Sequence, residues 1–172
     1  MINVTLGRTN ITVNRNGFGA LPIQRASEKD SIRIIQKAYH NGIRFFDTAR
    51  AYSDSEEKLG LALCQVRQNV FISTKTMQTT VDGFWKDLDT SLHLLKTDYI
   101  DLCLLHQPFS DVYGAYRALE DLMAEGKIRA IGISNFYVDR MVDIASFARV
   151  KPAVNQIEIH PHHQQNEQLE WA

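Results

Sequence analysis

Short apolar runs alternate along the chain with longer segments in which apolar residues recur every three or four positions. A short run predicts a buried strand, and the three-to-four spacing predicts an amphipathic helix. The alternation returns about every 30 residues, which is typical of strand–helix–strand units around a parallel sheet. The clearest helical face is formed by Val81, Phe84, Leu88, Leu92 and Leu95.

No Pro/Gly-rich linker or low-complexity segment interrupts this alternation, so we expect one domain over residues 1–172. Val4–Leu6 and Ile11–Val13 flank a polar turn and predict a hairpin ahead of the repeat. The predicted strands of the repeat are Gly17–Ala20, Arg44–Asp47, Val70–Thr74, Tyr99–Leu105, Ile128–Ile133 and Ala153–Ile157. The predicted helices run from Ser27 to Gly42, from Ser55 onward, from Val81 to Leu95, through Tyr116 to Gly126, over Val138–Phe147 and from Asn166 onward.

Two parallel α/β architectures fit these elements. An open doubly wound sheet accommodates six strands, but its dinucleotide fingerprint is missing because Pro22 stands where the third glycine after Gly17 and Gly19 belongs. A (β/α)8 barrel requires eight strands and about 250 residues. The sequence therefore favours a TIM-barrel type α/β fold with an N-terminal hairpin, truncated after the sixth strand.

The composition of the chain argues against some classes of binding partner. The chain is 44% apolar and 23% charged with a formal net charge of -1, which gives no electrostatic case for nucleic acid or an anionic membrane. No signal-peptide layout and no apolar run near the roughly 18 residues of a spanning helix occurs. Cys64 and Cys103 are far apart, and Cys103 lies in a predicted strand, so we expect a free buried thiol and a cytoplasmic protein.

Polar side chains that carry proton chemistry stand at or just after the carboxyl ends of successive predicted strands: Asp47, Tyr52, Lys75 and His106. Catalytic groups collect at this rim of a parallel barrel. A phenol has a pKa near ~10, and a neighbouring ammonium is expected to lower it and ease proton release. A carboxylate makes a partly buried ammonium tolerable. Each residue alone also fits a turn, packing or solvated position, but their joint occurrence favours catalysis.

A histidine-rich segment offers an alternative chemistry. His160, His162 and His163 lie close to Glu158, but their spacing matches no standard zinc pattern. We therefore expect no metal site.

Several ordered motifs resemble the successive signatures of the aldo-keto reductases, and together they cover nearly the whole chain. They are Phe46-Asp47-Thr48-Ala49-Arg50-Ala51-Tyr52, Ser73-Thr74-Lys75, Leu104-Leu105-His106-Gln107-Pro108, Gly132-Ile133-Ser134-Asn135-Phe136 and Asn155-Gln156-Ile157-Glu158-Ile159-His160-Pro161. The resemblance implies a (β/α)8 barrel enzyme that reduces aldehydes and ketones to alcohols by hydride transfer from NADPH.

The resemblance also implies roles for individual residues. Tyr52 is expected to be the general acid, Lys75 and Asp47 to form an ion pair that tunes its pKa, and His106 to orient a small carbonyl substrate. The residues expected to contact the cofactor are Gly19, Ala20, Asp47, Ser134, Asn135 and Gln156.

The sequence departs from this family at its C-terminal end. The resemblance implies that loops after strands 7 and 8 hold the cofactor's pyrophosphate and 2′-phosphate, and no match to them is found within residues 1–172. Two hypotheses follow. The chain is the N-terminal part of a carbonyl reductase, or it is a catalytically incompetent barrel fragment that acts as a binding or assembly module. Exposed strand edges would favour self-association in either case.

Overall fold

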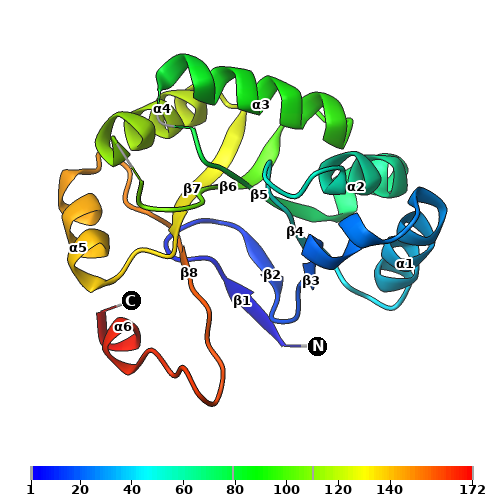
Figure 1. Ribbon diagram of the computed structural model, residues 1–172, viewed down its shortest axis with the longest axis horizontal. Coiled ribbons are helices and arrows are strands. Elements are labelled where there is room, and N and C mark those ends of the chain that lie inside the picture. The colour runs from blue at the N-terminus through cyan, green and yellow to red at the C-terminus, as the bar shows by residue number, and fades with distance from the viewer. Residues whose placement is uncertain (1, 79, 110, 172) are drawn as a thin grey trace.

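A curved parallel sheet forms the centre of the molecule (Figure 1). The computed structural model describes residues 2–78, 80–109 and 111–171, and these contain six parallel strands in the order β3-β4-β5-β6-β7-β8. Each strand pairs with the next one along the chain, as the predicted repeat requires. The strands are β3 (Phe18–Gly19), β4 (Phe45–Asp47), β5 (Phe71–Thr76), β6 (Ile100–Leu105), β7 (Ile128–Ser134) and β8 (Asn155–Gln156).

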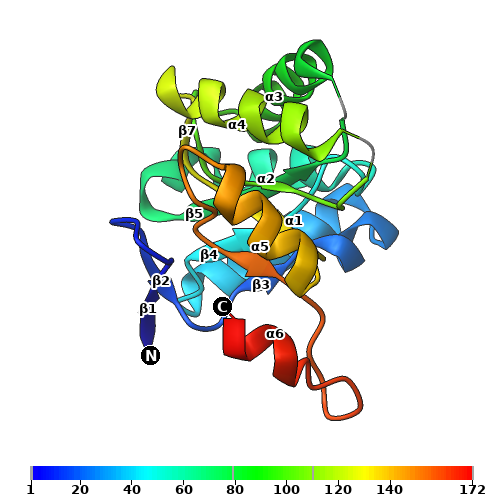
Figure 2. The same ribbon diagram turned by 90° about the vertical axis from the view of Figure 1, so that its left-hand side faces the viewer.

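Helices cover the outer, convex side of this sheet (Figure 1). The α-helices are α1 (Glu28–His40), α2 (Ser55–Leu63), α3 (Val81–Leu95), α4 (Val112–Ala124), α5 (Val138–Phe147) and α6 (Asn166–Trp171). Ser27 caps α1 as predicted, because its hydroxyl accepts the Asp30 amide at 3.1 Å. Figure 2 shows α6 beyond the loop that follows β8, below α5. None of the described helices is long and apolar enough to cross a membrane.

The sequence misjudged some short elements. The predicted strand Gly17–Ala20 is only Phe18–Gly19, and the predicted strand Ala153–Ile157 is only Asn155–Gln156. Both lie at the edges of the described sheet and pair on one side only, so fewer ladder hydrogen bonds hold them extended. Two 3-10 helices, η1 (Leu21–Arg25) and η2 (Cys64–Asn69), were not predicted.

Strand alternation divides the core into two layers. Phe46, Ile72 and Ile131 belong to the larger apolar cluster, which includes the helices. Their strand neighbours point the other way, into the concave side. There Leu102 and Leu104 pack against Ile11 and Val13 of the hairpin. The alternation therefore gives the sheet two buried faces.

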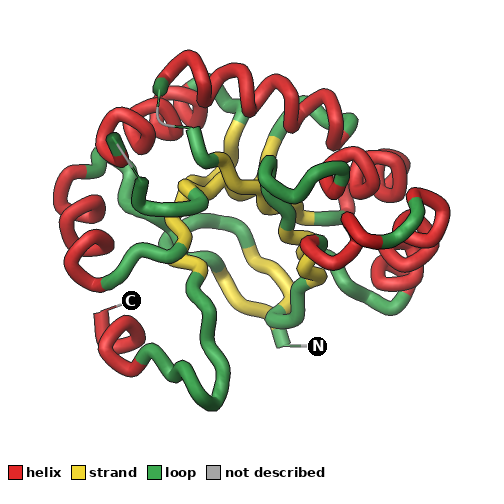
Figure 3. The backbone as a smooth tube through the Cα atoms, in the orientation of Figure 1, coloured by secondary structure: helices red, strands yellow, loops and turns green. Residues whose placement is uncertain are grey.

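The predicted N-terminal hairpin, β1 (Asn3–Thr5) and β2 (Thr12–Asn14), lies within the arc of the strands (Figure 3). Phe45 and Phe71, the first residues of β4 and β5, pack against this inner cluster. The hairpin thus closes the end of the sheet where the strands begin. The carboxyl ends of the strands remain for polar side chains.

A buried carboxylate links the elements near the beginning of the strands. Asp101 is 1% exposed, pairs with Arg67 at 2.8 Å and Arg129 at 2.5 Å, and accepts the Ile72 amide at 3.0 Å. Arg67 also donates to the Tyr99 carbonyl. This network joins η2 with β5, β6 and β7.

We expect Asp101→Asn to lower the free energy of unfolding by about 3 kcal/mol, because it removes the negative partner of two arginines within a buried cluster. Urea unfolding measures this loss. Asp98→Asn changes an exposed residue before the same strand and should stay within about 0.5 kcal/mol of the parent. Equal, small losses in both variants would show that the network does not contribute to stability.

Candidate active site

The predicted catalytic residues meet at the carboxyl ends of β4, β5 and β6. Asp47 is the last residue of β4, Lys75 lies near the end of β5, and His106 directly follows β6. Parallel register brings these ends together, because Asp47 pairs with Ser73 and Lys75 pairs with Leu104. The structure therefore gathers these side chains on one rim.

Lys75 and Asp47 form a buried ion pair. Lys75 is 1% exposed, and its Nζ donates to Asp47 Oδ2 at 2.6 Å and to the Thr48 carbonyl at 2.8 Å. Removing an ammonium from water is costly unless acceptors surround it. These two acceptors leave the third N–H of Lys75 without a partner among the described residues.

Tyr52 lies in the loop between β4 and α2 and faces both cationic and aromatic neighbours. Lys75 Nζ is 5.2 Å from the centroid of the Tyr52 ring, and the ring meets His106 edge-on at a centroid distance of 5.6 Å. The three side chains thus lie close to one another. This is the juxtaposition that the strand-end pattern predicted.

The predicted lowering of the Tyr52 pKa was wrong, because other effects outweigh the nearby ammonium. Burial raises the pKa of the Tyr52 phenol above its usual range, and the nearby negative charge of Asp47 raises this pKa further. The carboxylate pairs with Lys75 at 2.6 Å and so opposes the field of the ammonium at the phenol. Tyr52 therefore keeps its proton at neutral pH.

His106 is held as a neutral imidazole. Burial lowers the pKa of His106, the positive charge of Lys75 lowers it further, and Asp47 partly opposes them. Its Nδ1 is buried without a hydrogen-bond partner in the described part of the chain. This ring nitrogen therefore remains able to form a hydrogen bond in the site.

Amide side chains continue the site across β7 and β8. Gln156 Nε2 donates to Asp47 Oδ1 at 3.2 Å, which ties the last described strand to the ion pair. Asn135 Nδ2 donates to the His106 carbonyl and to Ser134 Oγ, both at 3.1 Å. Asn135 has φ of 61°, a left-handed conformation that asparagine tolerates better than most residues.

Gly19 and Ala20 lie at the opposite edge of the same rim. The Ala20 amide donates to the Asp47 carbonyl at 2.8 Å. A Cβ placed on Gly19 would meet nothing within 4 Å, so the space beside this residue is open. The predicted site residues thus lie at the carboxyl ends of the strands or in the segments that follow them.

Sequence reasoning missed the polar residues behind this rim. Glu56 lies in the first turn of α2, is 1% exposed and pairs with Arg50. Its other partners come from β5 and α3, far away in sequence. The one signal in the sequence was the polar residue Thr74 next to Lys75, which indicates a polar group on each face of the strand.

The histidine-rich segment stands apart from these residues. His160 lies 3.1 Å from Glu158, and its ring centroid lies 5.9 Å from that of His163. Among the described residues, no three His, Cys, Asp or Glu side chains gather in a way that would hold a metal ion. These contacts are those of an exposed turn.

Known proteins are similar to this chain in sequence and in fold. The chain is 38% identical to glyoxal reductase of Bacillus subtilis over 166 residues, covering 91% of this chain and 58% of that protein. It is 37% identical to methylglyoxal reductase DkgA of Escherichia coli O157:H7, covering 88% of this chain and 57% of that protein. The structure of a Bombyx mori aldo-keto reductase in complex with NADP matches with a TM-score of 0.88 at 27% identity, covering 98% of this chain and 62% of that one.

The chain therefore spans a little over half the length of both reductases. The likeness to the solved structure confirms the predicted fold of the (β/α)8 barrel type. The model of the aldo/keto reductase family matches residues 15–172, which is most of the chain. This protein belongs to the aldo/keto reductase family.

Proposed function

We propose that the protein reduces an aldehyde or ketone to an alcohol with NADPH as the reductant. The observation that carries this proposal is the proximity of Tyr52 to both Lys75 and His106, with Asp47 paired to the Lys75 ammonium. The names of the glyoxal and methylglyoxal reductases support a small carbonyl substrate.

The residues on β7 and β8 suit a nicotinamide carboxamide. Such a group offers both a carbonyl acceptor and an amide donor. In the described part of the chain, Asn135 Oδ1 and Gln156 Oε1 accept no hydrogen bond, and the Ser134 hydroxyl retains a proton to donate. We assign the carboxamide to these three residues. The open space beside Gly19 and the adjoining Ala20 would accommodate the cofactor.

The cofactor supplies the hydride when it is bound. Hydride addition places negative charge on the carbonyl oxygen, and Tyr52 neutralises it by giving up its phenolic proton. The raised pKa of Tyr52 keeps that proton available at neutral pH. Lys75 and a neutral His106 supply a positive charge and an N–H group that stabilise the developing oxyanion. Asp47 maintains Lys75 as the buried cation.

We propose a cytoplasmic location. Cys64 and Cys103 are free thiols, as is usual for proteins of a reducing compartment. Burial raises the pKa of Cys103 to about 12, which keeps this thiol protonated and unreactive.

We expect Tyr52→Phe to lower NADPH-dependent reduction of methylglyoxal by about 100-fold or more, because the general acid is lost. NADPH oxidation followed by absorbance measures turnover, and NADPH fluorescence titration should give the same affinity as the parent. Tyr39→Phe is the matched control. Tyr39 lies on α1, and its ring packs against the Arg44 guanidinium. Unchanged turnover in Tyr52→Phe would reject the acid role. Cofactor binding without turnover in the parent would favour the non-catalytic binding module.

The protonation of His106 provides a second test. We expect Lys75→Met to raise the pKa of His106, because the substitution removes a positive charge that disfavours the imidazolium and leaves Asp47 unopposed. His106 should consequently begin to bind its proton at a higher pH than in the parent. NMR titration of the imidazole measures this change, and the resonances of His93 on the exposed side of α3 should not differ between the proteins. A lower pKa in Lys75→Met would contradict the electrostatic account.

A further inference from the structure

Glu56 is a buried carboxylate that the proposed reaction does not use. It lies in the first turn of α2 and is 1% exposed. Its Oε1 accepts hydrogen bonds from Thr74 Oγ1 at 2.6 Å and Ser91 Oγ at 2.8 Å, and its Oε2 pairs with Arg50 Nη1. One carboxylate thereby joins α2, β5, α3 and the 48–54 loop.

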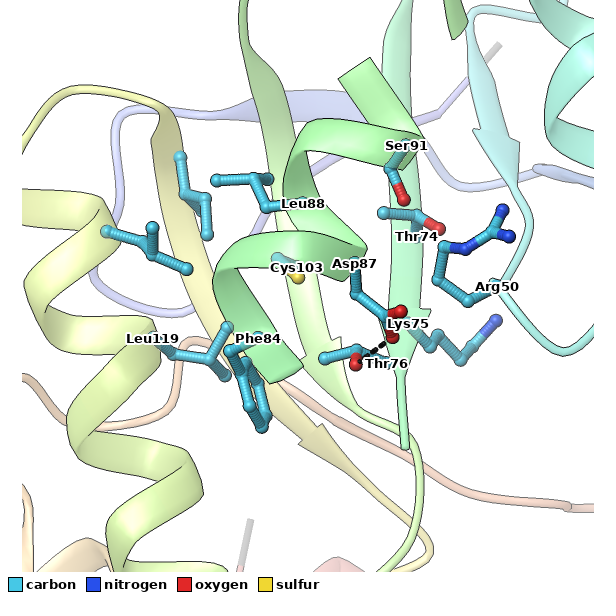
Figure 4. A pocket seen from close by; sticks show the side chains of 12 residues that line it. Arg50, Thr74, Lys75, Thr76, Phe84, Asp87, Leu88, Ser91, Cys103 and Leu119 are labelled. Carbon is cyan, nitrogen blue, oxygen red and sulfur yellow. Dashed lines mark hydrogen bonds between the residues drawn. The ribbon is translucent and has the colours of Figure 1, made fainter. Parts of the chain in front are cut away.

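This carboxylate holds the loop from the outer face of the sheet. Thr74 and Lys75 are neighbours on β5, so their side chains point to opposite faces. Lys75 binds the loop on the inner face through the Thr48 carbonyl, and Thr74 binds it on the outer face through Glu56 and Arg50. Figure 4 shows Thr74, Ser91 and Arg50 on the same side of the strand, and the hydroxyls of Thr74 and Ser91 both donate to Glu56.

The loop contributes to the position of the Tyr52 hydroxyl because it carries the ring. Among the described residues this hydroxyl makes no hydrogen bond, so its position follows from the loop backbone and from the ring contacts with Lys75 and His106. Arg50 is two residues away, and its amide donates to the Lys75 carbonyl at 2.9 Å. The Arg50 side chain is 23% exposed and is drawn inward to the buried carboxylate. A shift at Arg50 would therefore move the phenol.

We propose that Glu56 is a positioning residue that acts through Arg50 to set where the Tyr52 phenol lies relative to Lys75 and His106. The expected effect on turnover rests on the proposed function. The expected effect on the position of Tyr52 concerns the loop alone and is tested without measuring turnover.

Two variants separate this role from general stability. Glu56→Gln keeps an oxygen for Thr74 and Ser91 but turns an N–H group toward Arg50, and Arg50→Met removes the guanidinium from a partly exposed side chain. Glu120→Gln is the matched control. Glu120 is also buried, at 5% exposed, and also pairs with an arginine, Arg117, but it lies on α4.

The direct measurement is NMR of the 172-residue chain labelled with 13C at the tyrosine Cζ and with 13C in histidine. Tyr52→Phe identifies the Tyr52 signal by its loss. In Glu56→Gln and Arg50→Met we expect loss of the NOE between the Tyr52 and His106 rings. We also expect the pKa of Tyr52 to fall toward its usual value, because a displaced phenol is less buried. Glu120→Gln should retain both features.

Turnover supplies the catalytic measurement. We expect both variants at the Glu56–Arg50 pair to lower kcat about tenfold or more while the KM for NADPH changes less than about twofold, because misplacement of one reacting group penalises the chemical step. Glu120→Gln should keep the parent kcat.

An unchanged NOE and Tyr52 titration in folded Glu56→Gln and Arg50→Met would overturn the inference. If Glu56→Gln does not fold, Arg50→Met decides the matter, and a failure of both to fold would assign the pair a structural role instead. If the parent shows the NOE but no turnover, and both variants lose the NOE, the proposed function is rejected while the positioning role stands.

Discussion

A buried ammonium is stable inside a protein only where a carboxylate and further acceptors surround it. Lys75 is such a buried ammonium, at the rim of the sheet. Asp47 and the Thr48 carbonyl meet it from the end of β4. The same carboxylate then accepts Gln156 from β8. Through these contacts one ion pair connects the strand that begins the candidate site with the strand that ends it.

The architecture keeps this polar centre away from the apolar core. The N-terminal hairpin fills the concave side near the beginning of the strands, and the helices cover the convex side. The carboxyl ends of the strands then carry the Lys75–Asp47 pair. Lys75 on the inner face and Thr74 on the outer face then hold the 48–54 loop from both sides. Two adjacent residues of one strand thus serve the site through opposite faces.

Periodicity in the sequence predicted the helices and the order of the strands, because both depend on local spacing and on burial of one face. Strand-end position also predicted that Asp47, Lys75 and His106 converge. The Glu56 network escaped prediction, since its partners Thr74 and Ser91 are distant in sequence.

Electrostatics at the rim were harder to predict than position. The sequence places an ammonium near the Tyr52 phenol, but the sign of the pKa shift depends on burial and on the opposing charge of Asp47. Both are properties of the folded chain. The lengths of β3 and β8 likewise depend on having a neighbour on one side only.

A double-mutant cycle on Lys75 and Asp47 tests the central claim most directly. The free energies of unfolding of Lys75→Met, Asp47→Asn and the double variant are measured in urea. We expect each single change to cost about 3 kcal/mol, because each leaves a buried charge without its partner, and the double change to cost about 2 kcal/mol less than the sum. Additive losses, within about 0.5 kcal/mol, would contradict the view that this ion pair organises the rim.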